Sequence, residues 1–270
     1  MISSHFKRWI TAVIAVPILF VLVLYASDLV FALFVTAVSL VGMLEYNRLV
    51  FDTPSMPERL LTILFALLLP LAAHFGNSHV VLGVIAVGVL VSLVGYVLTK
   101  ARVGNFDLSS PARLLLGVLY IPFLLSHIIL LRQGEKGINW VFFIIVIAFA
   151  GDVAAFYIGR TFGKRKLAPR VSPGKTVEGI YGLVAGSVLG CVVYQHFVFP
   201  QLPVAHAVVM GFMGSLIGQT GDLFESTIKR ASGVKDSGEI LPGHGGILDR
   251  IDCLLFIIPF VYYYKVFVIA

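Results

Sequence analysis

The sequence has 270 residues, of which 59% are hydrophobic and 13% are charged, a ratio far outside the range of water-soluble domains. Its formal net charge of +6 does not indicate a nucleic-acid partner, because the basic residues lie between apolar runs and are not interleaved with aromatic residues on a solvated face. Composition therefore excludes a soluble globular protein and favours an integral membrane protein.

The apolar residues are grouped in runs of about 20, the length that a helix needs to cross a hydrocarbon core about 30 Å thick. A bilayer offers no partner for unpaired backbone groups, so each run is expected to be helical. The first run follows two basic residues, as in a signal peptide, but it is as long as a span and lacks a small-residue cleavage site. It is therefore interpreted as a transmembrane helix. The sequence predicts an all-α polytopic protein with about nine spans, near residues 9–26, 29–46, 60–75, 80–98, 113–131, 139–159, 179–199, 205–225 and 251–269.

The positions of the basic residues predict how the protein lies in the membrane. With the N-terminus in the cytoplasm, 17 of the 20 lysines and arginines lie on the cytoplasmic side, and only Arg132, Lys136 and Lys265 lie opposite. This asymmetry is the positive-inside pattern. The odd number of spans then places the C-terminus outside.

The two halves of the chain differ in polarity. The first five spans are almost purely apolar, whereas the last four carry acids, many glycines and two long polar loops at 160–178 and 226–250. No fixed-period repeat is present. We therefore expect one membrane domain over residues 1–270, with a mostly apolar helical scaffold at 1–135 and a catalytic half at 136–270.

Four acids lie at membrane depth, namely Glu45, Asp152, Asp222 and Glu225. A central aspartate costs roughly 2.5–3.5 kcal/mol to insert, so each acid needs an explanation. Glu45 has Arg48 at i+3 near the end of its span, and this favours a local ion pair near the interface. The sequence assigns no role to Asp152.

A polar stripe runs along the eighth predicted span. Asp222, Glu225, Ser226 and Lys229 are spaced i, i+3, i+4 and i+7, which places them on one helix face. Two acids, a hydroxyl and an ammonium group would then face one cavity. The alternative is a self-neutralised stripe that holds helices together.

The loop after this stripe combines glycines with charged residues. Gly243, Gly245 and Gly246 surround His244, and such glycines permit the backbone conformations in which successive N–H groups bind an anion. Most glycine-rich loops are merely turns, but this one lies beside basic residues and favours phosphate binding. The basic residues are Lys229, Arg230, Lys235 and Arg250. Two acids, Asp249 and Asp252, follow at i, i+3, where a helix N-terminus also favours carboxylates.

The other long loop holds Ser172, Lys175 and Thr176 just before Glu178 and Gly179. Hydroxyls and an ammonium group at a helix start suit a polyphosphate, although the spacing of a Walker A loop is missing. The basic run at 164–166 is equally consistent with a patch that faces lipid headgroups.

These groups favour phosphoryl or nucleotidyl transfer at a membrane surface. Carboxylates with hydroxyls suit a hard cation such as Mg²⁺, and the basic groups would take the remaining phosphate charge. A lipid phosphate is already anionic near pH 7, so a site with few convincing bases suits such a nucleophile. His244 is a candidate base, and equally a donor to phosphate or to the loop backbone.

The segment from Ser226 to Asp252 resembles the signature of the phosphatidate cytidylyltransferase (CDP-diacylglycerol synthase) family. The matching positions are Ser226, Lys229, Arg230, Lys235, Asp236, Gly238, Leu241, Pro242, His244, Gly245, Gly246, Asp249, Arg250 and Asp252. The segment from Asp152 to Gly179 is also similar to that family. Family members often carry a second lysine where this chain has Gly174, so the phosphate role of this loop depends on Lys175 and its neighbours.

The resemblance implies a Mg²⁺-dependent nucleotidyltransferase that makes CDP-diacylglycerol and pyrophosphate from CTP and phosphatidate in phospholipid biosynthesis. It implies a homodimer in the bacterial inner membrane, with the active site open to the cytoplasm and the metal ion on Asp222 and Asp249. A second, monovalent cation is left open. The catalytic residues would be Asp222, Ser226, Lys229, Asp249 and Asp252. The phosphate-binding residues would be Ser172, Lys175, Thr176, Arg230, Lys235, His244, Gly245, Gly246 and Arg250.

Two other classes of protein use similar groups. A CTP-dependent lipid kinase is the runner-up, whereas a CDP-alcohol phosphotransferase would require a D-G-x-x-A-R core that this sequence lacks. A secondary transporter would also bury acids, but its site residues are expected within paired spans rather than in two loops on one face.

Overall fold

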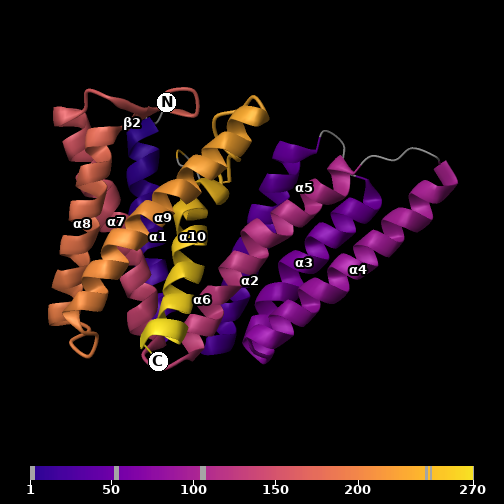
Figure 1. Cartoon of the computed structure of the whole chain (residues 1–270), viewed down its shortest axis with the longest axis horizontal. Helices are drawn as coiled ribbons and strands as arrows, with labels where there is room; N and C mark the ends of the chain where they lie inside the picture. Colours follow the sequence, from indigo (N-terminus) through magenta and orange to yellow (C-terminus); the bar gives the residue numbers. More distant parts are fainter. Residues whose placement is uncertain (1–3, 52–54, 104–107, 241–242, 244, 270) are drawn as a thin grey trace. The chain divides into compact units, whose positions relative to one another are not determined.

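The computed structural model describes residues 4–51, 55–103, 108–240, 243 and 245–269. Over these residues the chain is almost entirely helical, with one small hairpin (Figure 1). The elements are α1 (Ser4–Tyr25), α2 (Asp28–Val50), α3 (Met56–Phe75), α4 (Ser78–Val103), α5 (Ser109–Val118), η1 (Leu119–Phe123), α6 (Leu124–Gln133), α7 (Gly137–Phe162), β1 (Lys166–Ala168), β2 (Ser172–Thr176), α8 (Val177–Phe197), α9 (Val204–Ala231), α10 (Leu248–Tyr264) and η2 (Lys265–Ile269).

In the described part of the chain, eight helical stretches are long and apolar enough to cross a membrane. A shorter apolar stretch, Val16–Tyr25, belongs to α1. The helices α5, η1 and α6 run together as one span, Ser109–Gln133, and the π-helical turn η1 contains Pro122, which has no N–H to donate to the helix ladder. The predicted all-α polytopic class is confirmed.

The chain divides into two compact units. The first unit comprises residues 1–133 and 236–249, and the second comprises residues 134–235 and 250–270. The segment 236–249, which carries much of the signature, therefore belongs with the N-terminal helices. The prediction that the chain functions as one membrane domain, with a scaffold half and a catalytic half, stays a prediction.

In the first unit, α2 packs against α3 and α6, and α3 packs against α4. Buried side chains between these helices include Met43, Tyr46 and Leu69. Polar groups in this core bond across helices: the Asn47 side chain donates to the hydroxyl of Thr62 at 2.6 Å, and the Tyr46 hydroxyl donates to a backbone carbonyl of α5 at 2.9 Å. These bonds satisfy groups that would be costly to leave unpaired in an apolar environment.

In the second unit, α8 lies beside both α7 and α9 (Figure 1). Gly182, Gly186 and Gly190 follow each other at intervals of four residues and face α7. A Cβ on Gly186 would lie 2.5 Å from the Cβ of Ala154 and 2.6 Å from the carbonyl oxygen of Ala150. The two backbones therefore approach too closely for a side chain, as is common between helices in membranes.

This close packing leads to a first prediction. Gly186→Leu should destabilise the protein by about 1–3 kcal/mol, because the added atoms force α7 and α8 apart. Thermal unfolding in detergent measures the effect. The matched control is Gly83→Leu in α4, where a Cβ would meet no atom within 4 Å. Equal melting temperatures for the two variants would contradict close packing at Gly186.

The loop before α8 contains an antiparallel hairpin that the sequence did not predict. Lys166 in β1 pairs with Thr176 in β2, and Ala168 pairs with Ser172. The Thr176 side chain then caps α8 by accepting a hydrogen bond from the backbone N–H of Gly179 at 3.1 Å. The polar loop is thus an ordered structure that ends in a helix cap.

Glu178, in the first turn of α8, fixes the other end of this loop. Its carboxylate accepts hydrogen bonds from the backbone N–H groups of Lys164 at 3.0 Å and Arg165 at 3.1 Å. It also pairs with the Arg165 side chain at 3.2 Å, and this hydrogen bond raises the pKa of the exposed Arg165 guanidinium. The predicted acid-then-glycine helix start is therefore used to anchor the hairpin.

Candidate active site

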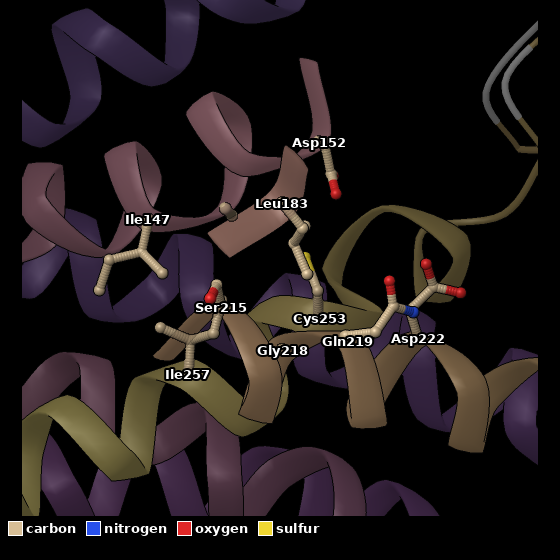
Figure 2. Close-up of a pocket in the computed structure, with 10 residues that line it drawn as sticks. Ile147, Asp152, Leu183, Ser215, Gly218, Gln219, Asp222, Cys253 and Ile257 are labelled. Carbon is tan, nitrogen blue, oxygen red and sulfur yellow. The ribbon is translucent and has the colours of Figure 1, made fainter. Parts of the chain in front are cut away.

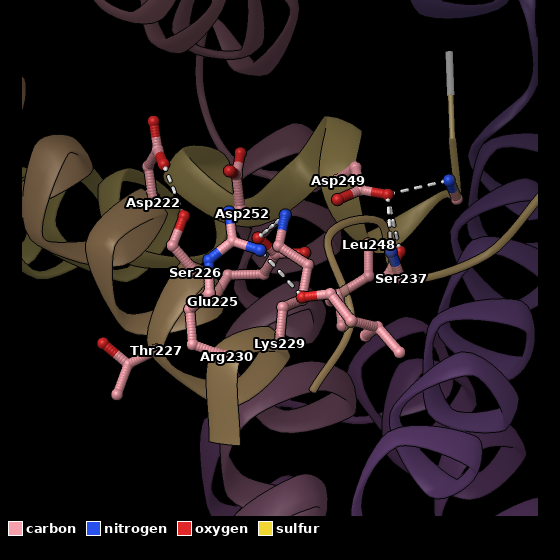
Figure 3. A network of polar contacts seen from close by, with 12 residues as sticks. Asp222, Glu225, Ser226, Thr227, Lys229, Arg230, Ser237, Leu248, Asp249 and Asp252 are labelled. Atoms are coloured by element: carbon pink, nitrogen blue, oxygen red, sulfur yellow. Dashed lines mark hydrogen bonds and ion pairs between the residues drawn. The ribbon is translucent and has the colours of Figure 1, made fainter. Parts of the chain in front are cut away.

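The polar stripe predicted on the eighth span lies near the C-terminal end of α9 (Figure 3). Lys229 and Glu225 form an ion pair with 2.5 Å between Nζ and Oε2, and the Glu225 side chain is completely buried. The Ser226 hydroxyl donates to Asp222 at 3.5 Å, a long hydrogen bond. The stripe therefore consists of a buried ion pair beside a more accessible acid.

The hairpin is connected to α9 at two points in the second unit. Lys175 in β2 forms an ion pair with Asp222. The Arg230 guanidinium donates to the carbonyl of Val171 at 3.2 Å and to that of Val234 at 2.9 Å. Two residues predicted from separate loops, Lys175 and Asp222, are thereby brought together. Arg230, predicted to bind phosphate, holds backbone carbonyls in this structure.

A small pocket, open to the surface, lies beside Asp222 in the second unit (Figure 2). Asp152 reaches it from α7, Gln219 and Asp222 from α9, and Cys253 from α10. Its other lining residues, Ile147, Ala148, Leu183, Ser215, Gly218 and Ile257, are mostly apolar. The lining of this pocket therefore combines apolar side chains with two carboxylates and an amide.

Asp222 interacts electrostatically with two other carboxylates of the second unit. Asp152 interacts electrostatically with Asp222 and Lys175. Asp252, on α10, interacts with Asp222, Lys175 and Lys229. In the sequence, Asp152 is one of four acids at membrane depth and has no assigned role. Its interaction partners lie on other elements, so no local pattern indicates them.

The signature acid Asp249 lies in the first turn of α10 and belongs to the first unit. Three donors reach its Oδ2 atom: the Ser237 backbone N–H at 2.8 Å, the Ser237 hydroxyl at 2.9 Å and the Gly246 N–H at 2.9 Å (Figure 3). Gly245 adopts a φ of +79°, and a Cβ there would lie 2.6 Å from the same oxygen. Asp249 thus organises the loop that precedes it.

The contacts of Glu45 differ from those that the sequence predicts. The sequence predicts a local ion pair with Arg48, but the buried Glu45 carboxylate accepts hydrogen bonds from Ser237, Ile247 and Leu248. That prediction is wrong because these donors lie about 200 residues away along the chain and leave no local signal.

The remaining predicted residues are more dispersed. Ser172 is partly buried at the start of β2, whereas Lys235 and Arg250 are exposed. The predicted phosphate role of Gly246 stays a prediction, although its N–H already donates to Asp249. His244 lies outside the described residues. Asp222 and Asp249 belong to different units, so their predicted sharing of a metal ion also stays a prediction.

The donor chemistry suits a hard divalent cation, because Asp152 and Asp222 line one pocket and Asp252 interacts with Asp222. Among the described residues, however, no group of three or more histidine, cysteine, aspartate or glutamate side chains is arranged to hold an ion. Asp222 is paired with Lys175. Cation binding would therefore require these side chains to change partners.

Acids, a lysine and an ordered polar loop, placed among apolar helices, can bind and neutralise phosphate groups. The model of the cytidylyltransferase family matches residues 6–268. The chain belongs to this family.

Curated relatives match over nearly their whole length. The chain is 34% identical to "Phosphatidate cytidylyltransferase" of Bacillus subtilis (strain 168) over 264 residues, which are 95% of this chain and 96% of that protein. It is 35% identical over 256 residues to the protein of the same name from Staphylococcus epidermidis (strain ATCC 12228 / FDA PCI 1200), covering 93% and 95%. The Staphylococcus aureus (strain COL) protein is 34% identical with the same coverage.

Proposed function

We propose that this protein is a phosphatidate cytidylyltransferase, which converts CTP and phosphatidate into CDP-diacylglycerol and pyrophosphate. The observation that carries the proposal is the match to proteins of this name over 93–95% of the chain. The charged groups around Asp222 support it, because two further acids and Lys175 interact with this carboxylate, a combination that suits phosphate chemistry.

The chemistry needs charge neutralisation more than a strong base. An oxygen of the lipid phosphate attacks the α-phosphorus of CTP, a new P–O–P bond forms, and the bond to the β-phosphate breaks to release pyrophosphate. The attacking phosphate oxygen is anionic near pH 7, so no strong base is needed to remove a proton from it. A site with lysines, arginines and acids fits this reaction.

We assign the residues of α9 and α10 to the reacting phosphates. Lys229, held by Glu225, would neutralise charge on the α-phosphate, and Ser226 and Asp252 would orient ligands. A second set would bind the β- and γ-phosphates or the lipid phosphate. That set is Ser172, Lys175, Thr176, Arg230, Lys235, His244, Gly245, Gly246 and Arg250.

Cytidylyl transfer with CTP generally needs a divalent metal, and we propose Mg²⁺, held by Asp222 and Asp249. When bound, such an ion neutralises triphosphate charge and fixes its orientation. In this proposal the Lys175 ammonium group pairs with Asp222 when no substrate is bound. It would turn to a phosphate of CTP when the substrate and the metal ion are bound.

Lys175→Met should raise the KM for CTP roughly ten- to a hundredfold, with a smaller change in kcat. A hydrogen bond to a charged group contributes about 1.5–3 kcal/mol, which corresponds to that range. Steady-state kinetics in detergent micelles measure it. The matched control is Lys166→Met in β1, whose side chain is exposed on the same hairpin. Equal KM values for both variants would remove Lys175 from the site.

The substrates themselves provide the test of function. Purified protein with CTP and Mg²⁺ should release pyrophosphate only when phosphatidate is present. Diacylglycerol in place of phosphatidate should give no pyrophosphate, because it lacks the attacking phosphate. Pyrophosphate release that does not depend on the lipid would contradict the proposal.

The protein is a membrane protein, and we propose that it lies in the bacterial inner membrane as a homodimer, with its active site towards the cytoplasm. The distribution of basic residues supports this orientation. In a background with Cys191 and Cys253 replaced by alanine, a membrane-impermeant maleimide should label Glu135→Cys in spheroplasts, from which the outer membrane has been removed. Lys164→Cys should be labelled only after lysis. The reverse pattern would invert the proposed topology.

A further inference from the structure

We propose that Glu45, on the N-terminal helix α2, is a positioning residue that holds the signature segment 236–249 and, through Ser237, orients Asp249. All the groups involved belong to the first unit. The inference rests on the proposed function only for the role of Asp249, because the contacts of Glu45 are independent of it.

The Glu45 carboxylate is almost completely buried and is surrounded by donors from this segment. Its Oε1 accepts a hydrogen bond from the Ile247 N–H at 3.0 Å. Its Oε2 accepts from the Leu248 N–H at 2.9 Å and from the Ser237 hydroxyl at 3.0 Å. Burying a carboxylate is costly unless it is hydrogen-bonded, and bonds to a charged acceptor are stronger than those between neutral groups. The cost of burying the Glu45 carboxylate is therefore offset by these three hydrogen bonds to the signature segment.

The donors identify what Glu45 does. The helix α10 begins at Leu248, directly after Ile247, and the first N–H groups of a helix have no partner within the helix. A carboxylate at this end also interacts favourably with the helix dipole. Glu45 thus caps α10 from a different helix and fixes where it starts. Asp249 is the second residue of α10, so its position depends on that start.

Ser237 connects Glu45 directly to Asp249. Its hydroxyl oxygen lies 3.0 Å from Oε2 of Glu45 and 2.9 Å from Oδ2 of Asp249, and the Ser237 residue is buried. A hydroxyl has one proton, so it donates to one carboxylate at a time. The two acids are therefore coupled through a single group.

Two glycines of the signature leave room for this arrangement. A Cβ on Gly246 would fall on the Ser237 hydroxyl and on the Glu45 carboxylate. A Cβ on Gly238 would lie 2.7 Å from Oε1 of Glu45. The sequence suggested that Gly246 gives a phosphate access to the backbone. The structure supplies a second reason for glycine at both positions, namely the close approach of Glu45.

The experiment compares Glu45→Gln with Asn47→Ala. Asn47 is two residues away on α2 and is also buried, but its side chain bonds to Thr62 of α3 rather than to the signature segment. Hydrogen exchange is followed by mass spectrometry, without substrates, in peptides that contain Ile247 and Leu248. Glu45→Gln should speed exchange there at least about tenfold, because an amide offers a donor where an acceptor is needed. Asn47→Ala should leave these peptides unchanged.

Kinetics then test the connection to Asp249. Partners that orient a metal-binding side chain typically change metal affinity or activity by 10- to 100-fold. Glu45→Gln and Ser237→Ala should each raise the Mg²⁺ concentration for half-maximal activity about tenfold or more, and the double variant should add little to either. Asn47→Ala should leave that concentration within about twofold.

The outcomes separate this inference from the proposed function. Unchanged exchange at Ile247 and Leu248 in Glu45→Gln would overturn the positioning role even if the enzyme transfers cytidylyl groups. Faster exchange in a protein without that activity would support positioning and sink the proposed function. If Glu45→Gln does not fold, Ser237→Ala decides: an unchanged Mg²⁺ requirement overturns the coupling to Asp249.

Discussion

Asp249→Asn is expected to reduce turnover at least about a hundredfold while leaving the protein folded. A group that only orients a metal ligand changes activity 10- to 100-fold, and in the proposed metal site Asp249 is itself a ligand, so loss of its charge should do at least as much. The fold should persist because asparagine keeps an oxygen that can accept the N–H bonds of Ser237 and Gly246. This substitution therefore removes the negative charge of Asp249 but keeps an acceptor for its hydrogen bonds with the loop.

The measurement is CTP-dependent pyrophosphate release, together with the melting temperature in the same detergent. Asp28→Asn is the matched control, because Asp28 pairs with Arg132 at 3.2 Å and does not contact the signature segment. Asp28 is half-exposed, so its ion pair should contribute little, and Asp28→Asn should keep normal activity. Normal turnover in Asp249→Asn would remove Asp249 from the proposed metal site.

Lys229→Met is expected to be both unstable and inactive. It leaves the carboxylate of Glu225, whose side chain is completely buried, without its ion-pair partner. Breaking a buried pair from one side typically costs about 3–5 kcal/mol. Activity should also fall about a hundredfold or more, the usual effect of removing one group that stabilises charge in the transition state.

The double variant Lys229→Met/Glu225→Met separates these two effects. Replacing a whole buried pair by apolar residues of similar volume is often neutral for stability, so the melting temperature should return towards that of the unmodified protein. Activity should stay low, because no ammonium group is restored. Recovery of activity in the double variant would mean that Lys229 only compensates the charge of Glu225.

The helices could be predicted because hydropathy is local. Every apolar run of sufficient length corresponds to helix, including α5, η1 and α6, where Pro122 changes the backbone without ending the span. The hairpin at 166–176 was missed for a related reason. Its strands have three and five residues, β2 contains Pro173 and Gly174, and neither strand shows a clear alternation.

The candidate site was predictable where it depends on one helix. The i, i+3, i+4 and i+7 spacing correctly placed Asp222, Glu225, Ser226 and Lys229 along α9. Their partners were not predictable, since Lys175 reaches Asp222 from 47 residues away and periodicity carries no information on such contacts.

Glu45 shows how a local rule can mislead. Arg48 at i+3 offered a sufficient explanation within one helix, whereas the contacts that the structure shows join α2 to Ser237 and the start of α10. An acid buried in an otherwise apolar half of the chain was the signal that could have found it. The N-terminal helices therefore support the signature segment directly.

The most direct measurement follows each phosphorus of CTP. Two preparations of CTP, labelled at the α- or the γ-phosphate, are incubated with the purified protein, phosphatidate and Mg²⁺, and the lipid is extracted. Cytidylyl transfer predicts that the α-label enters the lipid and that the γ-label leaves in pyrophosphate. A γ-label in the lipid, with the α-label left on a soluble nucleotide, would show a lipid kinase and contradict the proposed function.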